Sequence, residues 1–256
     1  MGVLLAFTKK EWLEAVRTGK LLILILLFTL FGIMNPAVAK LLPWMMEIFS
    51  DTMEETGIII TEMQVDAMTS WMQFFKNIPM ALIAFLLLYS DLFTKEYQSG
   101  TLLLMLTKGL PRYKAVLAKT GLLFSVWTLC YFLCFAVTYG YNAYFWDNSI
   151  ANNLFPAAAF WWLFGVWLIS LLVLFSSLLQ NSAGVVLCTG GSVVILYLVS
   201  FLPWIKSYMP LSLLDSASLL VGMKGAAEYT GSVAVTAILG IVCVAASLFV
   251  INRKHI

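Results

Sequence analysis

The sequence predicts an all-α integral membrane protein with six transmembrane helices. Of its 256 residues, 62% are hydrophobic and only 11% are charged, and the mean hydropathy is +0.94. A soluble domain has about 45–50% apolar and about 25% charged residues, so this composition favours lipid as the solvent. Six apolar segments alternate with polar connections, and the basic residues gather on every second connection. The net charge of +2 gives no sign of a nucleic-acid partner.

A helix lying on the membrane surface is expected at residues 3–18. Leu5, Trp12, Leu13 and Val16 share one arc of the helical wheel, and charged residues occupy the opposite arc. This pattern is typical of helices in the interface plane. The alternative is a cytoplasmic helix that extends the first span.

The first span is expected at residues 21–39, because nine of the ten residues from Leu21 to Leu30 are Leu, Ile or Phe. The second, at 77–93, is the weakest, since its strictly apolar part is short for a span that needs about 20 residues. The remaining spans are expected at 120–140, 156–179, 183–202 and 232–251. The whole chain, 1–256, is expected to form a single transmembrane domain.

The connection at 204–231 is too apolar for a free loop. Its segment Leu211–Val221 is expected to form short helices in the outer leaflet. Orientation follows from Lys and Arg, which are enriched in cytoplasmic connections. One set of connections carries eleven of these residues and the other carries four. The first set is therefore predicted to be cytoplasmic, together with both termini.

Catalytic and metal-binding residues are not expected in this chain. It has no G-x-x-x-x-G-K-[ST] phosphate loop. His255 is its single histidine and lies next to the C-terminus, so a Ser/His/Asp set or a histidine metal site is not indicated. Cys130 and Cys134 fall in an apolar segment and are expected to be buried apolar side chains.

The connection 91–119 carries an unusual apolar run. Leu102–Leu106 reads LLLML between charged flanks, and such a run needs cover from the membrane or from a partner protein. Gly100 interrupts the preceding helix and Pro111 ends the segment. A short apolar helix of this kind fits a groove on a soluble partner. The alternative is an interfacial helix that only connects two spans.

This loop also has an acidic residue, Glu96, four positions before the pair Gly100-Thr101. The Leu-rich run, Thr107 and Arg112 follow, and then Lys119, which enters the third span. In these features the sequence resembles the type-2 exporter permeases of ABC transporters. The resemblance extends to the FTKKEW start, the six spans, the polar hairpin Ser176–Gly184 and the outer loop with Pro210. Two departures are Lys108, where a Pro is common, and Gln98, where many members have a second acid.

The resemblance implies a mechanism and a set of partners. Two permeases, either two copies of this chain or this chain with a homologue, would pair in a bacterial plasma membrane and dock two ATPase subunits. ATP and Mg would be bound by the ATPase, and this chain would hold no cofactor. The loop at 94–112 would act as a coupling helix that transmits ATPase movement to the spans. The implied ATPase-coupling residues are Glu96, Gly100, Thr101, Leu102, Leu103, Leu104, Met105, Leu106, Arg112 and Lys119.

Within this set, Glu96 would make polar contacts at the base of the second span, and Leu102–Leu106 would fill a groove on the ATPase. Arg112 and Lys119 would pair with ATPase acids or anionic lipid heads, or would serve as ordinary positive-inside charges. The expected cargo is apolar or amphipathic (a peptide antibiotic, drug or lipid), with sodium as the other candidate.

Two alternatives remain from the sequence. A secondary transporter uses intramembrane charges and broken helices, and only Asn35-Pro36 and Gly190-Gly191 hint at such breaks. A non-transporting membrane subunit is the second alternative. A membrane enzyme has almost no candidate residues.

Overall fold

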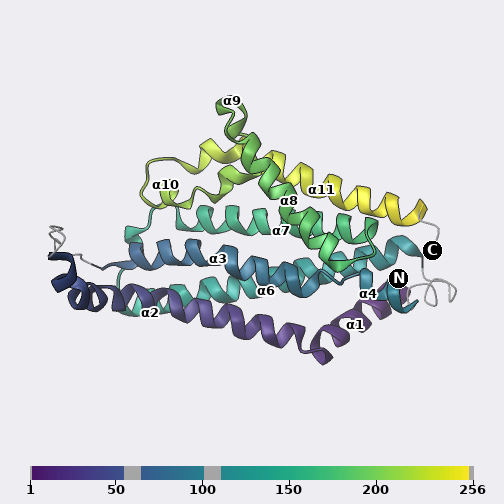
Figure 1. Cartoon of the computed structure of the whole chain (residues 1–256), viewed down its shortest axis with the longest axis horizontal. Helices are drawn as coiled ribbons and strands as arrows, with labels where there is room; N and C mark the ends of the chain where they lie inside the picture. The colour runs from purple at the N-terminus through teal and green to yellow at the C-terminus, as the bar shows by residue number, and fades with distance from the viewer. Residues whose placement is uncertain (1, 55–64, 101–110, 254–256) are drawn as a thin grey trace.

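The computed structural model describes residues 2–54, 65–100 and 111–253. Within these ranges, six helical segments are long and apolar enough to cross a membrane, as the sequence predicted. The helices that supply them are α2 (Lys20–Glu54), α3 (Ala67–Tyr89), α6 (Arg112–Phe145), α7 (Leu154–Leu178), α8 (Ser182–Val199) and α11 (Thr230–Arg253). Figure 1 shows α2, α3, α6, α7 and α11 running side by side as a bundle, while α8 crosses it obliquely.

Three of these helices, α2, α3 and α6, extend well beyond the apolar segments that predict them. α2 has 35 residues and α6 has 34, which correspond to about 50 Å each against a hydrocarbon core of about 30 Å. α3 begins ten residues before the apolar segment expected at 77–93, and Asp66 caps it by accepting the N–H of Thr69 at 3.1 Å. The helices therefore continue beyond the expected spans. The second apolar segment lies within the 23-residue α3 up to Tyr89, and its last four residues, 90–93, form the turn before α4.

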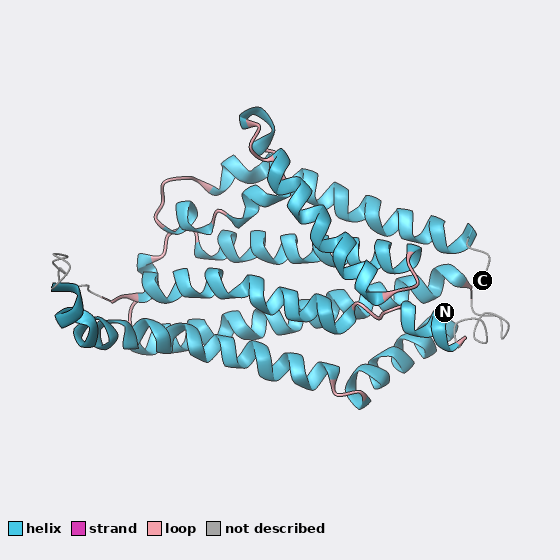
Figure 2. Cartoon of the chain, viewed as in Figure 1, coloured by secondary structure: helices cyan, strands magenta, loops and turns pink. Residues whose placement is uncertain are grey.

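The N-terminal helix α1 (Gly2–Arg17) is separated from α2 by a tight turn. Gly19 has φ +72°, a backbone conformation that favours glycine. The two ends of the described chain lie at the same end of the bundle, with α1 folded beside them (Figure 1). Figure 2 shows that the described elements are all helical and that mostly short loops join them.

The core of the bundle is aromatic. Trp71 and Phe74 of α3 and Trp127 and Tyr131 of α6 are fully buried. Edge-to-face contacts link Phe74 to Tyr131, with ring centroids 6.0 Å apart. Gly165 of α7 faces Trp127 so closely that an added Cβ would lie 2.2 Å from the indole ring. The absence of a side chain at 165 thus lets α7 pack directly on α6.

α8 is the least enclosed span. Only 11% of the residues in its apolar stretch are buried within the described chain, against 61% for α7. Both pairs of residues that hinted at broken helices lie inside continuous helices, Asn35-Pro36 in α2 and Gly190-Gly191 in α8.

Between α8 and α11 the chain forms the short helices α9 (Pro203–Lys206), η2 (Pro210–Leu214), α10 (Ser216–Leu220) and η3 (Ala226–Tyr229); the short η1 (Asn148–Ile150) lies between α6 and α7. Of these, α10 lies toward the end opposite to the termini, and α9 projects from the side of the bundle (Figure 1). Asp215 accepts hydrogen bonds from Ser218 at 2.7 Å, Lys224 at 2.8 Å and Tyr229 at 3.1 Å. Burial alone would raise the pKa of Asp215, but the hydrogen bonds from Lys224 and Ser218 outweigh it and lower the pKa. Asp215 therefore holds Ser218, Lys224 and Tyr229 of this segment together.

Candidate functional site

A short helix, α4 (Thr94–Ser99), follows α3 at the end of the bundle where the chain termini lie (Figure 1). Its C-cap is Gly100, which has φ +67° and donates its N–H to the carbonyl of Tyr97 at 3.3 Å. Open space surrounds the position of a Cβ here, so the requirement for glycine is conformational. The predicted coupling residues Thr101 and Leu102–Leu106 lie outside the described residues.

Glu96 of α4 is buried although it is an acid, with 7% of its surface exposed. Its Oε1 is 3.0 Å from Nζ of Lys119 on α6 and 3.4 Å from Nζ of Lys10 on α1. Its Oε2 is also buried and has no hydrogen-bond partner in the described part of the chain. Through Oε1, one carboxylate joins three helices that are far apart in the sequence.

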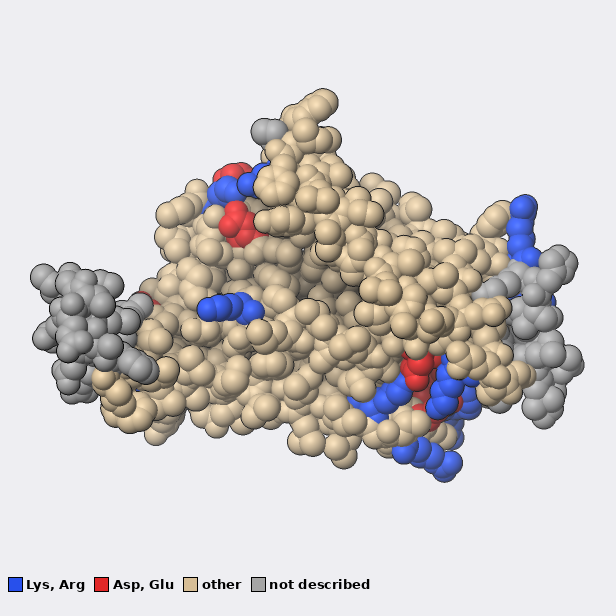
Figure 3. Space-filling view, in the orientation of Figure 1, with Lys and Arg blue, Asp and Glu red and all other residues tan. Residues whose placement is uncertain are grey.

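Lys119 is the centre of this arrangement. It is 3% exposed, and its Nζ also lies 2.9 Å from Oε2 of Glu11 on α1. Lys10 in turn binds the other oxygen of Glu11 at 2.9 Å and the carboxylate of Glu14 at 2.8 Å. We call these five residues, Lys10, Glu11, Glu14, Glu96 and Lys119, the charge cluster. Figure 3 shows acidic and basic side chains together at the end of the molecule near α1 and α4, on an otherwise largely uncharged surface.

Within the charge cluster, the electrostatics favour the charged forms of Lys10 and Glu14. Burial lowers the pKa of Lys10, but hydrogen bonds to Glu14 and Glu11 outweigh this effect and raise it well above its usual value. The hydrogen bond from Lys10 lowers the pKa of Glu14. Removing one partner of a buried ion pair typically costs about 3–5 kcal/mol, because the other charge is left uncompensated. The cluster is therefore a strong constraint on how α1, α4 and α6 sit together.

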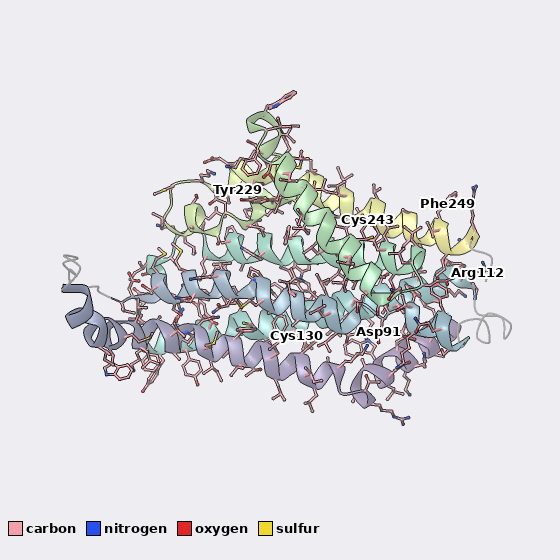
Figure 4. The ribbon with its side chains drawn as sticks, in the orientation of Figure 1. Asp91, Arg112, Cys130, Tyr229, Cys243 and Phe249 are labelled. Carbon is pink, nitrogen blue, oxygen red and sulfur yellow. The ribbon has the colours of Figure 1, made fainter. Side chains whose placement is uncertain are left out.

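Further polar contacts fix α4 and the turn before it. Lys20 at the start of α2 binds Asp91 after α3 at 2.6 Å, and Asp91 lies at this end of the bundle (Figure 4). The backbone N–H of Phe93 donates to the hydroxyl of Ser176 near the end of α7 at 3.2 Å.

Gln98 explains one departure of the sequence from the family pattern. Its side-chain amide donates to the carbonyl of Gln180, in the turn after α7, at 3.2 Å. An ionised acid at this position has no proton to donate. The glutamine thus attaches α4 to the α7–α8 turn in a way that the more common acid would not.

Arg112 begins α6 and lies near the C-terminal end of α11. Its Nη1 donates to the carbonyl of Ile251 at 3.2 Å, and Figure 4 shows Arg112 and Phe249 of α11 at the same end of the bundle. A cation is favourable at a helix C-terminus, where carbonyl groups lack partners. Arg112 therefore links the start of α6 to the end of the last span.

The structure brings together two of the predicted site residues, Glu96 and Lys119. Gly100 ends the short helix that carries Glu96. In this structure Lys119 pairs with carboxylates of its own chain. The sequence analysis offered ATPase acids, anionic lipid heads or a role as an ordinary positive-inside charge. Sequence reasoning missed Glu11, which it placed on the polar arc of a surface helix. The available signal was Lys119 itself, since a lysine flanked by apolar residues needs a carboxylate partner when it is buried.

The six-span helical bundle and its buried charge cluster define the chain as a multi-pass membrane protein in which α1 and α4 are attached to the spans. A family model described as "ABC-2 family transporter protein" matches residues 5–250. The chain belongs to this family, and it is therefore a membrane permease subunit of an ABC transporter. The match begins within α1 and ends within α11, so it includes every member of the charge cluster. No curated protein and no solved structure matches the chain significantly.

Proposed function

We propose that this chain is the permease of an ATP-driven exporter whose ATPase is a separate polypeptide. ATP and Mg would be bound by that partner, because this sequence has no phosphate loop. Membership of the ABC-2 family supports the proposal. The loop at 94–112 would dock on the ATPase, with the apolar run Leu102–Leu106 as the contact.

The observation that carries this proposal is the buried pair Glu96–Lys119, with its 3.0 Å separation. α4 directly precedes the apolar run in the chain, and the pair ties α4 to α6 while Glu11 ties α6 to α1. A force on the loop would therefore move α1, α3 and α6 together. Such rigid-body movement of packed elements is a common way to switch between two states.

The end of the bundle that carries the charge cluster would face the cytoplasm of a bacterial cell, with both termini there. The excess of Lys and Arg on that side supports this orientation. A second copy of the chain, or a homologous permease, would complete the pathway, and each would dock one ATPase. The low burial of α8 supports a partner, since few residues of this apolar helix are buried within the described chain.

The cargo would be apolar or amphipathic, such as a peptide antibiotic, a drug or a lipid, with sodium as the other candidate. The spans carry few charged residues, and their walls are rich in aromatic side chains. This composition favours contacts with apolar molecules over the binding of a charged solute.

The test is co-purification of the ATPase with permease variants at matched membrane abundance. Leu103→Asp would place a charge in the predicted contact, so the ATPase should be lost while the permease still inserts. Ile150→Asp is the control, because Ile150 is 45% exposed in η1 at the opposite end of the bundle. Retention of the ATPase by Leu103→Asp at the wild-type level would contradict the assignment.

A second variant separates docking from coupling. Glu96→Gln keeps the size of the side chain and leaves Lys119 paired with Glu11. We expect the ATPase to stay bound, while ATP hydrolysis no longer responds to transport substrate. If Glu96→Gln instead keeps normal substrate-stimulated hydrolysis, the charge cluster has no part in coupling.

A further inference from the structure

A cavity of about 700 Å³ lies in the segment that joins α8 to α11, and its lining differs from that of a lipid-facing groove. The end of α8 forms one side, and α9, η2 and η3 contribute the others. Serines, tyrosines and leucines line it together with four charged side chains: Lys206, Asp215, Lys224 and Glu228. Figure 3 shows acidic and basic side chains together between α9 and α10. This volume and these mixed walls are typical of sites for small molecules.

Two of the four charges already hold the wall of the cavity together. Lys224 binds Asp215 at 2.8 Å, and Tyr229 donates its hydroxyl to the same carboxylate at 3.1 Å. The ring of Tyr229 is buried and packs on Phe160 of α7, with the ring centroids 5.5 Å apart. This wall is therefore fixed to a span, and its two charges compensate each other.

The other two charges have no partner of opposite sign. Neither Lys206 nor Glu228 takes part in an ion pair among the residues that the structure describes, although both line the same cavity. One oxygen of Glu228 accepts the backbone N–H of Gly225 at 3.0 Å, which leaves the charge of the carboxylate uncompensated. Both side chains are exposed, so a ligand can reach them. One cation and one anion thus remain for a ligand that carries both charges.

Exposed aromatic side chains surround the opening of the cavity. Phe201 lines the cavity, and it is exposed together with its neighbours Trp204 and Tyr208. Trp and Tyr gather at the level of the lipid headgroups in membrane proteins. The apolar helix α8 ends at Val199, just before this opening. A lipid at this place can therefore put its headgroup into the cavity while its chains lie along α8.

We propose that this cavity binds the headgroup of a zwitterionic lipid, with its phosphate at Lys206 and its ammonium group at Glu228. Phosphatidylethanolamine is a lipid of this class. A lipid with an anionic head would pair with Lys206 alone, and a cationic one with Glu228 alone. Each would leave one charge of the cavity without a partner, so the cavity selects by charge where a groove of plain hydrocarbon does not. That the bound lipid is the exported cargo rests on the proposed function, but its binding does not.

The test is photolabelling of the full chain in micelles of an uncharged maltoside detergent. Three lipids carry a diazirine near the top of one acyl chain and differ only in the head, which is phosphoethanolamine, phosphoglycerol or trimethylammonium. Labelling of residues 207–215 and 225–229 is measured relative to labelling of α2. Phosphatidylethanolamine should label these residues about fivefold more than either other lipid, the effect of one exposed ion pair at its upper value. Equal labelling by the three heads would overturn the site.

Two variants that each remove one charge should exchange the preference. Glu228→Gln keeps an oxygen for the N–H of Gly225, and it should bring phosphatidylethanolamine down to the level of phosphatidylglycerol. Lys206→Gln should instead bring phosphatidylethanolamine down to the level of the cationic lipid. Lys76→Gln is the control, because Lys76 is exposed on α3 and does not line the cavity, so it should keep the wild-type preference. A wild-type preference in both cavity variants would contradict the assignment of the two charges.

Competition distinguishes a lipid from a water-soluble molecule with the same two charges. Unlabelled lysophosphatidylethanolamine should displace the probe, whereas glycerophosphoethanolamine, which has the same head without a chain, should not displace it at the same concentration. Equal displacement by both would show that the cavity takes a soluble zwitterion and that the lipid is wrong. None of these readouts depends on the ATPase, so they stand even if docking fails its own test.

Discussion

Thr138 of α6 donates its hydroxyl to the carbonyl oxygen of Gly32 on α2 at 3.0 Å. That carbonyl is the one that Pro36, four residues later and without an N–H, cannot serve. Asn35 donates to the same hydroxyl at 3.3 Å, and Asn77 of α3 donates to Asn35 at 2.8 Å. A proline inside a span is thus accommodated because Thr138 of the neighbouring α6 supplies the missing donor, while Asn77 of α3 extends the polar network through Asn35.

Thr138→Val should destabilise the permease by about 1–3 kcal/mol, because it leaves a buried carbonyl and a buried amide without partners. Thr138→Ser keeps the hydroxyl and should be much milder. Melting temperatures of the detergent-solubilised protein check this. Equal melting temperatures for Thr138→Val and the wild type would show that the contact carries no stability.

Lys119→Met should destabilise the protein by up to about 3–5 kcal/mol, since it removes the buried lysine that Glu11 and Glu96 share and leaves them only the more exposed Lys10. The matched control is Lys224→Met, which breaks a more exposed pair with Asp215, worth about 0–1 kcal/mol. Thermal unfolding of both variants measures the difference. Similar losses in the two variants would mean that burial adds nothing to the charge cluster.

Gln98→Glu should loosen α4, because the carboxylate cannot donate to the carbonyl of Gln180. Gln98→Arg keeps N–H donors and should hold α4 in place. Hydrogen exchange of the amides at residues 94–99 should speed up about fivefold in Gln98→Glu, as expected for one lost hydrogen bond of about 1 kcal/mol. Unchanged exchange in Gln98→Glu would mean that other contacts hold α4 alone.

The proposed orientation is tested by thiol labelling in a background without the native cysteines. A cysteine at exposed Ser149, in η1, should react with an impermeant reagent from outside intact cells. A cysteine at Arg112 should react only after the membrane is opened. Labelling of position 112 from outside would reverse the arrangement and contradict cytoplasmic docking.

The number of spans followed from the apolar segments along the sequence, because a long apolar segment in lipid must be a helix that satisfies the hydrogen bonds of its own backbone. The positions of the helix ends did not follow from these segments. Residues 67–76 are not part of the apolar segment expected at 77–93, yet they continue α3. Hydropathy reports where the lipid ends, and a helix has no reason to end there when side chains such as Trp71, Phe74 and Phe75 continue to pack in the core.

The charge cluster could be predicted only in part. Glu96 and Lys119 were singled out from the sequence, but Glu11, the second carboxylate that Lys119 binds, lies 108 residues from Lys119 in the chain. The periodicity of α1 separates apolar from polar positions. It does not show whether a polar side chain such as Glu11 faces water or a buried lysine. Long-range pairing of this kind depends on how helices pack, which local patterns do not encode.

The approach of Gly165 to Trp127 restricts how this protein can change in evolution. An added Cβ at position 165 would lie 2.2 Å from the indole ring, so even alanine is excluded while the tryptophan remains. Replacing Trp127 with a smaller side chain opens a cavity in the core, at a cost of about 3–5 kcal/mol for alanine, but creates no steric clash. Any lineage that exchanges both residues must therefore change the tryptophan first, and the order of the two substitutions is fixed by the contact itself.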